Sequence, residues 1–142
     1  MVTLRYEIEG GNFNLAGRAS SQVKKVLKQL NIDSRLIKKI VVALYEGEVN
    51  IVAHAHRGVI EVAIKPDRVD MILTDKGPGI PDVEAAMREG FSTASQKVRE
   101  MGFGAGMGLP NIKKNTDCLH IDTKVGSGTT LTMTKYFDHG EE

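Results

Sequence analysis

The first thirty residues contain two patterns of apolar positions, one with the period of a β-strand and one with the period of a helix. Residues 2–8 alternate between apolar and polar side chains, which is typical of a half-buried strand. Gly10, Gly11 and Asn12 end this segment. From residue 16 to residue 30 the apolar residues recur every three or four positions, with lysines on the other faces. This spacing predicts an amphipathic helix.

A second helix is predicted over residues 34–56, where Asp33 or Ser34 can cap the first turn. Its middle is apolar on nearly every side, and helices of that kind are buried. A polar side chain in a buried helix needs a partner, an ion or a water molecule, because an unpaired buried carboxylate is costly. The segment EGEVN at 46–50 therefore requires an explanation.

The rest of the chain is predicted to be mostly strands. Residues 59–65 and 69–74 are rich in β-branched side chains, and Pro66-Asp67 between them indicates a hairpin. Further along we expect a turn at 75–82, a short helix from 82 to about 89, a glycine-rich loop or lid at 90–108, a weak helix at 109–117, and strands at 118–123 and 129–137. This order predicts one α+β domain over residues 1–142, a two-layer sandwich with helices on one face of a mixed, mostly antiparallel sheet.

Composition narrows the function classes. Nineteen Lys and Arg against eighteen Asp and Glu leave a net charge of +1, which argues against direct nucleic-acid binding and against a polybasic membrane binder. A single cysteine, Cys118, excludes an intramolecular disulfide framework and a cysteine-rich zinc site. No apolar run approaches the roughly 18 residues of a membrane span. We expect a cytoplasmic protein.

The predicted second helix carries the first candidate chemical group. Glu46, Asn50 and His54 are spaced by four residues and share one face. A carboxylate beside an amide oxygen can hold a hard cation or orient a water molecule. A solvated stripe on the helix has the same spacing, so the pattern leaves both interpretations open. His54 is interpreted as structural, and His56, two residues further on, cannot easily share a metal with it.

Three glycine-rich segments carry the other candidates. Asp75 followed by glycines suits a pocket for a nucleobase, because its carboxylate can accept from an exocyclic amine, although a simple turn has the same pattern. GFGAGMG at 102–108, before a helix, is typical of phosphate binding through backbone N–H groups, although a linker is the alternative. It is neither a P-loop nor a dinucleotide fingerprint. GSGTT at 126–130 alone indicates a hairpin turn.

In this order, the four motifs resemble those of the Bergerat-fold or GHKL ATPases, which share the histidine-kinase-like ATPase domain. The resemblance spans about residues 34–136. Three stretches look most like the free-standing anti-sigma-factor serine/threonine kinases and switch kinases: GIPDVEAAMREGFSTAS, GMGLPNIKKNTD and GSGTTLTMTK. Two features depart from that pattern. Glu48 is a second carboxylate, expected on the opposite helix face and solvated or paired, and QKVRE at 96–100 is a charged insertion in the lid.

The resemblance implies roles for the residues of the first two motifs. Glu46 would be the catalytic base, which accepts the proton of the attacking hydroxyl or water. Asn50 would coordinate Mg²⁺ that bridges the phosphates of ATP. Asp75 would bind the adenine amino group. The residues that would shape the adenine wall are Gly77, Gly79 and Ile80.

The resemblance also assigns the later motifs. An ATP lid would cover about residues 82–108, and its phosphate-binding residues would be Gly104, Gly106, Met107, Gly108 and Leu109. Either Thr129 or Thr130 would support the network between adenine and Asp75. Phosphoryl transfer also calls for a cation near the γ-phosphate, for which the candidates are Lys97, Arg99, Lys113 and Lys114.

These roles together imply an ATP-dependent protein serine/threonine kinase that phosphorylates a small anti-sigma-factor antagonist of the STAS type. The alternative keeps ATP binding but makes complex formation the output, by sequestering a sigma factor or activating a partner. A detached histidine-kinase domain is disfavoured, because a first strand at residue 2 leaves no room for a dimerisation helix pair. A nucleotide-free interaction domain would make four ordered motifs a coincidence. The strand at 2–8 could pair with a second subunit at a sheet edge.

Overall fold

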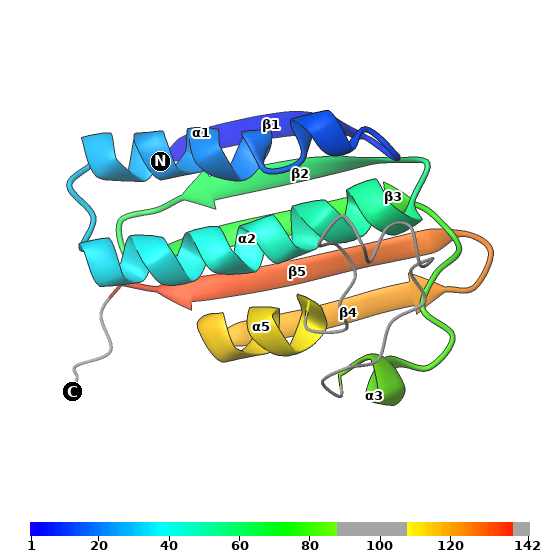
Figure 1. Ribbon diagram of the computed structural model, residues 1–142. Coiled ribbons are helices and arrows are strands. Elements are labelled where there is room, and N and C mark those ends of the chain that lie inside the picture. The colour runs from blue at the N-terminus through cyan, green and yellow to red at the C-terminus, as the bar shows by residue number, and fades with distance from the viewer. Residues whose placement is uncertain (88–107, 138–142) are drawn as a thin grey trace.

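The computed structural model describes residues 1–87 and 108–137, and these form a five-stranded sheet with helices on one face (Figure 1). The strands lie in the order β1-β2-β3-β5-β4. Their bounds are Val2–Glu9 for β1, Arg57–Ile64 for β2, Arg68–Lys76 for β3, Cys118–Lys124 for β4 and Gly128–Tyr136 for β5. The expected α+β sandwich is confirmed.

Every pair of neighbouring strands in this sheet is antiparallel, whereas the sequence predicted a mixed, mostly antiparallel sheet. The connections explain the difference. The chain reverses three times between β1 and β2, before α1, between α1 and α2, and after α2, and hairpins join β2 to β3 and β4 to β5. The strands β3 and β4 run in the same direction, but β5 lies between them and pairs antiparallel with both.

The main helices, α1, α2 and α5, lie side by side on one face of the sheet (Figure 1). In the described part of the chain the other face carries no helix. The bounds are Arg18–Gln29 for α1, Ser34–His54 for α2, Val83–Ala86 for the short α3 and Gly108–Asn115 for α5, with a 3-10 turn at Phe13–Leu15. None of these helices is long and apolar enough to cross a membrane.

The helix starts follow the predicted capping chemistry. Asp33 caps α2, since its side chain accepts from the N–H of Arg35 at 2.8 Å. Asp82 caps α3 in the same way through the N–H of Ala85 at 3.0 Å. One boundary differs in a way that matters for the site. The strand β3 continues to Lys76, so the aspartate expected just after the strand lies inside it.

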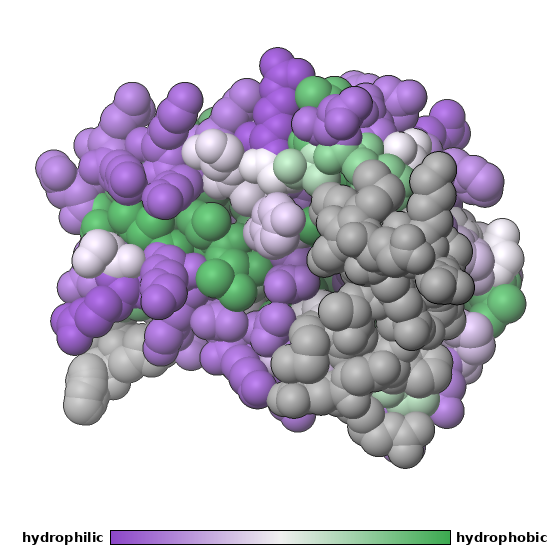
Figure 2. All heavy atoms as spheres, viewed as in Figure 1, coloured by the Kyte–Doolittle hydropathy of each residue, from purple (hydrophilic) through white to green (hydrophobic). Residues whose placement is uncertain are grey.

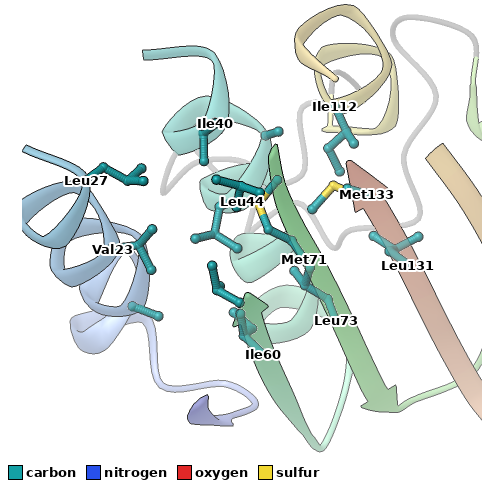
Figure 3. Close-up of a cluster of buried hydrophobic side chains, with 14 of the residues drawn as sticks. Val23, Leu27, Ile40, Leu44, Ile60, Met71, Leu73, Ile112, Leu131 and Met133 are labelled. Atoms are coloured by element: carbon teal, nitrogen blue, oxygen red, sulfur yellow. The ribbon is translucent and has the colours of Figure 1, made fainter. Parts of the chain in front are cut away.

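The core is the apolar layer between the helices and the sheet (Figure 3). Its largest fully buried side chains include Leu27, Ile40, Leu44, Ile60, Met71, Ile112 and Met133. Gly47 allows α2 to approach the sheet closely, because a β-carbon there would lie 2.4 Å from Cδ2 of Leu73. The outer side of α2 remains exposed at Arg35, Lys38 and Tyr45, so this helix is less buried than its apolar middle predicted.

The carboxylate of Glu48 ties α2 to the start of α1. Only 1% of Glu48 is exposed. Its Oε2 accepts from the N–H groups of Gly17 at 3.0 Å and Ala19 at 3.2 Å. Its Oε1 accepts from the N–H of Ser20 at 3.0 Å and from its hydroxyl at 2.6 Å. Glu48 is therefore paired and buried, as a cap for helix N–H groups that lack an intrahelical partner.

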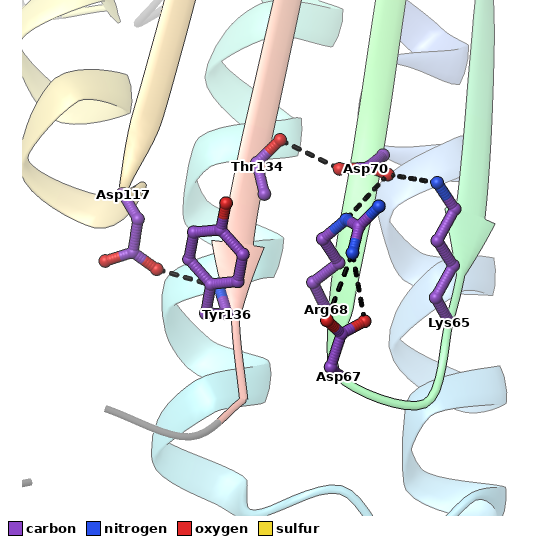
Figure 4. A network of polar contacts seen from close by, with 7 residues as sticks. All are labelled: Lys65, Asp67, Arg68, Asp70, Asp117, Thr134 and Tyr136. Carbon is purple, nitrogen blue, oxygen red and sulfur yellow. Dashed lines mark hydrogen bonds and ion pairs between the residues drawn. The ribbon is translucent and has the colours of Figure 1, made fainter. Parts of the chain in front are cut away.

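A polar network lies at the end of the sheet where a turn joins β2 to β3 (Figure 4). The carboxylate of Asp70 accepts from Nζ of Lys65 at 2.7 Å, from Nε of Arg68 at 3.2 Å and from the hydroxyl of Thr134 at 2.8 Å. Burial alone would raise the pKa of Asp70, but these hydrogen bonds and the positive charge of Lys65 outweigh it and lower the pKa. The network links three strands.

We expect Glu48→Ala to destabilise the protein by about 3 kcal/mol, because the substitution leaves buried N–H groups at the start of α1 without an acceptor. Urea unfolding followed by circular dichroism measures this free energy. The matched control is Glu61→Ala, since Glu61 is exposed on the helix-free face of the sheet and its loss should change stability by less than about 0.5 kcal/mol. Equal midpoints for the two variants would contradict the capping role of Glu48.

Candidate functional site

Four segments meet at one end of the molecule and bring the predicted site residues together. These are the C-terminal half of α2, the end of β3, the start of α5 and the turn between β4 and β5 (Figure 1). Hydrogen bonds and close contacts join them in pairs: α2 to α5, β3 to β5, and the segment after β3 to β4. The first and last motifs of the sequence thus belong to one region.

The two polar residues of α2 face the start of α5. Nδ2 of Asn111 donates to Oε2 of Glu46 at 3.1 Å. One turn further along α2, the side chain of Asn50 packs against Gly108, where an added β-carbon would lie 3.2 Å from Oδ1 of Asn50. Glu46 and Asn50 are half-buried, so neither is a freely solvated surface group. The structure therefore supports the interpretation of this pair as a site.

The carboxylate of Asp75 lies at the end of β3 with partial shielding from solvent. Its Oδ1 accepts from the backbone N–H of Thr129 on the neighbouring strand at 3.2 Å. Burial raises the pKa of Asp75, and the hydrogen bond from Thr129 opposes that shift. A half-buried carboxylate with one oxygen still to be paired can accept a hydrogen bond from a ligand amine.

The strand register separates the two candidate threonines. Thr129 lies directly opposite Asp75 and is buried on the helix side of β5. Thr130 lies opposite Thr74, and its side chain is on the helix-free face. The structure thus places Thr129, and not Thr130, with Asp75.

No sequence motif included Thr123, which links the segment after β3 to β5 through its hydroxyl group. Oγ1 of Thr123 accepts from the N–H of Ile80 at 2.9 Å and lies 2.9 Å from the hydroxyl oxygen of Thr129. It also donates to the carbonyl of Gly128 at 3.3 Å. Nothing in the local sequence of β4 marks this threonine, since its partners are distant along the chain.

The glycines of this region permit close approaches of the backbone. A β-carbon on Gly77 would lie 3.1 Å from Ala55 at the end of α2 and from Oδ1 of Asp75. Gly79 has a φ of +78°, and a β-carbon there would lie 2.5 Å from the carbonyl oxygen of Lys124. Gly128, which sequence reasoning assigned only to a turn, has a φ of +133° and would place a β-carbon 2.1 Å from the carbonyl oxygen of Asp75. Side chains at these positions would push the segments apart.

Part of the predicted site lies outside the described residues. Gly104, Gly106 and Met107 belong there, as do the candidate cations Lys97 and Arg99. Leu109 is buried in the core beside the start of α5. Lys113 and Lys114 are exposed in the last turn of α5, whereas Gly108 and Asn50 lie at its first turn. The two described lysines are therefore at the end of α5 away from the predicted phosphate site.

His54 lies in the last turn of α2, one turn after Asn50. Burial lowers the pKa of His54, which favours its neutral form and fits the structural role predicted for it. Within residues 1–87 and 108–137, no group of three or more His, Cys, Asp or Glu side chains could hold a metal ion. A metal here would need oxygen ligands from its substrate as well as from the protein.

The arrangement has the parts needed for a bound nucleoside phosphate. The start of α5 carries the positive end of a helix dipole, which favours an anion. Glu46 and Asn50 lie beside that helix end, and Asp75 lies at the end of β3. A base amine and a phosphate chain can therefore be recognised at different ends of one site.

Comparisons with known proteins agree with this geometry. Residues 14–135 match the family described as the histidine kinase-like ATPase domain, which implies ATP binding. The serine/threonine-protein kinase RsbT of Bacillus subtilis (strain 168) is 32% identical over 117 residues, with 80% of this chain and 82% of RsbT covered. The anti-sigma F factor of Caldanaerobacter subterraneus subsp. tengcongensis is 32% identical over 123 residues, with 83% and 82% covered.

Two solved structures share the fold. The RsbU and RsbW domains of Rv1364c from Mycobacterium tuberculosis match with a TM-score of 0.64 at 19% identity, over 95% of this chain and 32% of that longer one. The mycobacterial sensor histidine kinase MprB matches with a TM-score of 0.53 at 18% identity, over 95% of this chain and 97% of that one. The resemblance predicted from the motifs is confirmed. The chain belongs to the histidine kinase-like ATPase domain family, among its serine/threonine kinases of the anti-sigma-factor type.

Proposed function

We propose that this chain transfers the γ-phosphate of ATP to a hydroxyl group of a small regulatory protein, using Glu46 as the catalytic base. The observation that carries the proposal is the position of Glu46 and Asn50 on one face of α2, against the first turn of α5. A base, an amide oxygen and a helix N-terminus then act on the same phosphate. Phosphoryl transfer depends mainly on such positioning and on neutralisation of charge.

The adenine end of the nucleotide is proposed to bind at Asp75. Its Oδ1 is engaged by the N–H of Thr129, which leaves Oδ2 for the exocyclic amine of adenine. Thr123 holds Thr129 and Ile80 in place through its hydroxyl, so the wall beside the base is fixed before the nucleotide arrives. Gly77 and Gly79 keep this wall thin enough for a flat ring to reach the carboxylate.

Asn50 is proposed to hold Mg²⁺ at the phosphate end. The residues fit that ion, because Asn50 offers a hard oxygen ligand at the start of α5, and magnesium usually takes only one or two protein ligands together with phosphate oxygens and water. When bound, the ion would neutralise negative charge on the phosphates. The N-terminus of α5 would orient the same phosphates through its N–H groups.

Glu46 then acts on the acceptor. The hydroxyl oxygen of the partner attacks the γ-phosphorus, the bond to the β-γ bridging oxygen breaks, and ADP leaves. The proton of that hydroxyl passes to the oxygen of Glu46 that Asn111 does not hold. Glu46 must lie within hydrogen-bond reach of the acceptor for this step. A carboxylate on a rigid helix satisfies that requirement better than one on a loop.

The proposed partner is a small anti-sigma-factor antagonist of the STAS type, and a sigma factor is a second binding partner. The charge of the helical face supports a protein with an acidic surface. Glu46 and the buried Glu48 are the only carboxylates on α1, α2 and α5. All the basic side chains of these helices are exposed: Arg18, Lys24, Lys25, Lys28, Arg35, Lys38, Lys39, Lys113 and Lys114. On this face hydrophilic groups flank an apolar band (Figure 2).

The alternative function is a binding module that ATP switches on or off without phosphotransfer. It is favoured by the several relatives named anti-sigma F factor, whose name describes binding. The same nucleotide site serves both functions, so the two differ only in the role of Glu46. Either function would place the protein in the cytoplasm, where ATP and sigma factors are found.

A homodimer is also proposed. Among the described strands, the edge strand β1 pairs only with β2. Antiparallel pairing of two β1 strands about Tyr6 would place Arg5 of one copy opposite Glu7 of the other. Both side chains are exposed and form an ion pair of 3.2 Å within one strand, so such pairing would replace the two ion pairs within the strands by two between them.

We expect Asp75→Asn to weaken ATP binding at least tenfold, or about 1.4 kcal/mol, in titration calorimetry. The asparagine oxygen would still accept from Thr129, so its amino group would face the adenine amine and two donors would meet. Asp122→Asn, on the exposed face of β4, is the matched control and should leave the affinity unchanged. Unchanged affinity in Asp75→Asn would contradict adenine binding at this residue.

The same variant tests the raised pKa of Asp75. An acid with a raised folded-state pKa contributes stability below its unfolded value, near pH 4, and loses it as the pH rises through the folded-state pKa. At pH 7 the ionised Asp75 is therefore unfavourable, and Asp75→Asn should raise the thermal midpoint of the nucleotide-free protein. That gain should shrink as the pH is lowered toward 4. A lower midpoint at pH 7 would contradict this sign.

We expect Glu46→Gln to reduce phosphotransfer by about 100-fold or more while ATP binding is retained, because the amide cannot accept the proton. Purified protein would be incubated with Mg²⁺, γ-labelled ATP and a lysate of its source organism, beside Glu61→Gln as an exposed-carboxylate control. An acid-stable labelled band that Glu46→Gln lacks is the expected result.

Two results would change the proposal. A band of equal intensity with Glu46→Gln would remove Glu46 from the catalytic role. Retained ATP binding without any acid-stable band in the unmodified protein would favour the ATP-switched binding module instead.

A further inference from the structure

The side chain of Asn111 contacts the proposed catalytic carboxylate, although the sequence motifs assigned it no role. Its Nδ2 donates to Oε2 of Glu46 across 3.1 Å, and the two residues are 65 positions apart in the chain. Both side chains are half-buried. Within residues 1–87 and 108–137, Asn111 is the side chain that donates a hydrogen bond to the carboxylate of Glu46.

The contact belongs to a matched pair of contacts between α2 and α5. Gly108 packs on Asn50, and Asn111, one turn later in α5, bonds Glu46, one turn earlier in α2. Residues three or four apart share one helix face. The two helices therefore cross with their site residues in register, and the first turn of α5 fixes both polar side chains of α2.

We propose that Asn111 is a positioning residue that holds Glu46 in the orientation needed to accept the proton of the attacking hydroxyl. The proposal rests on the function assigned to Glu46 above. By occupying Oε2, the amide leaves Oε1 to face the acceptor and restricts rotation of a carboxylate that otherwise turns freely about its last bond.

The chemistry of an amide suits this role. A hydrogen bond from a neutral donor to a carboxylate is charge-assisted and directional. A lysine or arginine at the same place would also hold Glu46, but it would bring a permanent positive charge that competes for the carboxylate during proton transfer. Asparagine provides orientation without that counter-charge. Its short side chain is also fixed by the rigid first turn of α5, which the buried Leu109 and Ile112 anchor in the core.

The contact itself is tested by unfolding measurements that need neither ATP nor a partner. Asn111→Asp would place two carboxylates about 3 Å apart, so it should lower the urea midpoint. Glu46→Gln removes the repulsion and provides an amide donor to the new aspartate. The double variant should therefore recover most of the loss. An equal effect of Asn111→Asp in both backgrounds would show that the two side chains do not meet, and would overturn the proposal.

The positioning role is tested by single-turnover hydrolysis of Mg·ATP with water as the acceptor, together with the dissociation constant of ATP. We expect Asn111→Ala to slow hydrolysis by about 10- to 100-fold, because small misplacements of a catalytic group have effects of that size. ATP affinity should stay within about threefold. Asn111→Gln, which keeps a donor, should retain more activity than Asn111→Ala.

A second asparagine of α5 is the matched control. Asn115 donates from Nδ2 to the carbonyl oxygen of Asn111 at 2.7 Å and does not contact Glu46. Asn115→Ala therefore weakens the helix without touching the carboxylate, and should leave the hydrolysis rate near that of the unmodified protein. Equal losses of hydrolysis rate in Asn111→Ala and Asn115→Ala would show that Asn111 only stabilises the helix.

The outcomes separate this inference from the proposed function. Hydrolysis could be lost in Glu46→Gln while Asn111→Ala keeps full activity or turns over faster. That result would overturn the positioning role of Asn111 and leave Glu46 as the base. Full hydrolysis in Glu46→Gln would overturn both. Loss of rate in both variants, with ATP affinity retained, is the result that the inference predicts.

Discussion

The close contact between Gly47 and Leu73 determines where helix α2 lies on the sheet, and the site depends on that position. A β-carbon on residue 47 would lie 2.4 Å from Cδ2 of Leu73, so a larger residue would force either that side chain or α2 to shift. Lifting the helix would move Glu46 and Asn50 relative to Asp75, which is held by the sheet. The distance between the phosphate and adenine ends of the site is thus set by helix-sheet packing.

The same short segment of α2 uses its rotation of about 100° per residue to reach three neighbours. Gly47 faces the sheet, Glu48 caps α1, and Glu46 faces α5. The two glutamates look alike in the sequence, but their surroundings give them opposite tasks. Both carboxylate oxygens of Glu48 accept hydrogen bonds from the start of α1. In Glu46, Asn111 donates to Oε2, and Oε1 is the oxygen proposed to accept the proton.

Sequence patterns predicted the elements and several residues of the candidate site because these depend on local spacing. The four-residue interval placed Glu46 and Asn50 on one face, and the order of the glycine motifs indicated the family. What the sequence could not predict depends on contacts between distant segments. The choice of Thr129 follows from strand register, and Thr123 and Asn111 join the site only through the pairing of β4 with β5 and the crossing of α2 and α5.

The central claim is that one nucleotide spans Asp75 on β3 and Asn50 on α2. A crystal structure with Mg²⁺ and a non-hydrolysable ATP analogue tests it most directly. The account predicts the adenine amine within hydrogen-bond distance of the Asp75 carboxylate, the metal bound by the Asn50 oxygen, and Glu46 still paired with Asn111. Adenine bound away from Asp75, or phosphates bound away from the start of α5, would contradict it.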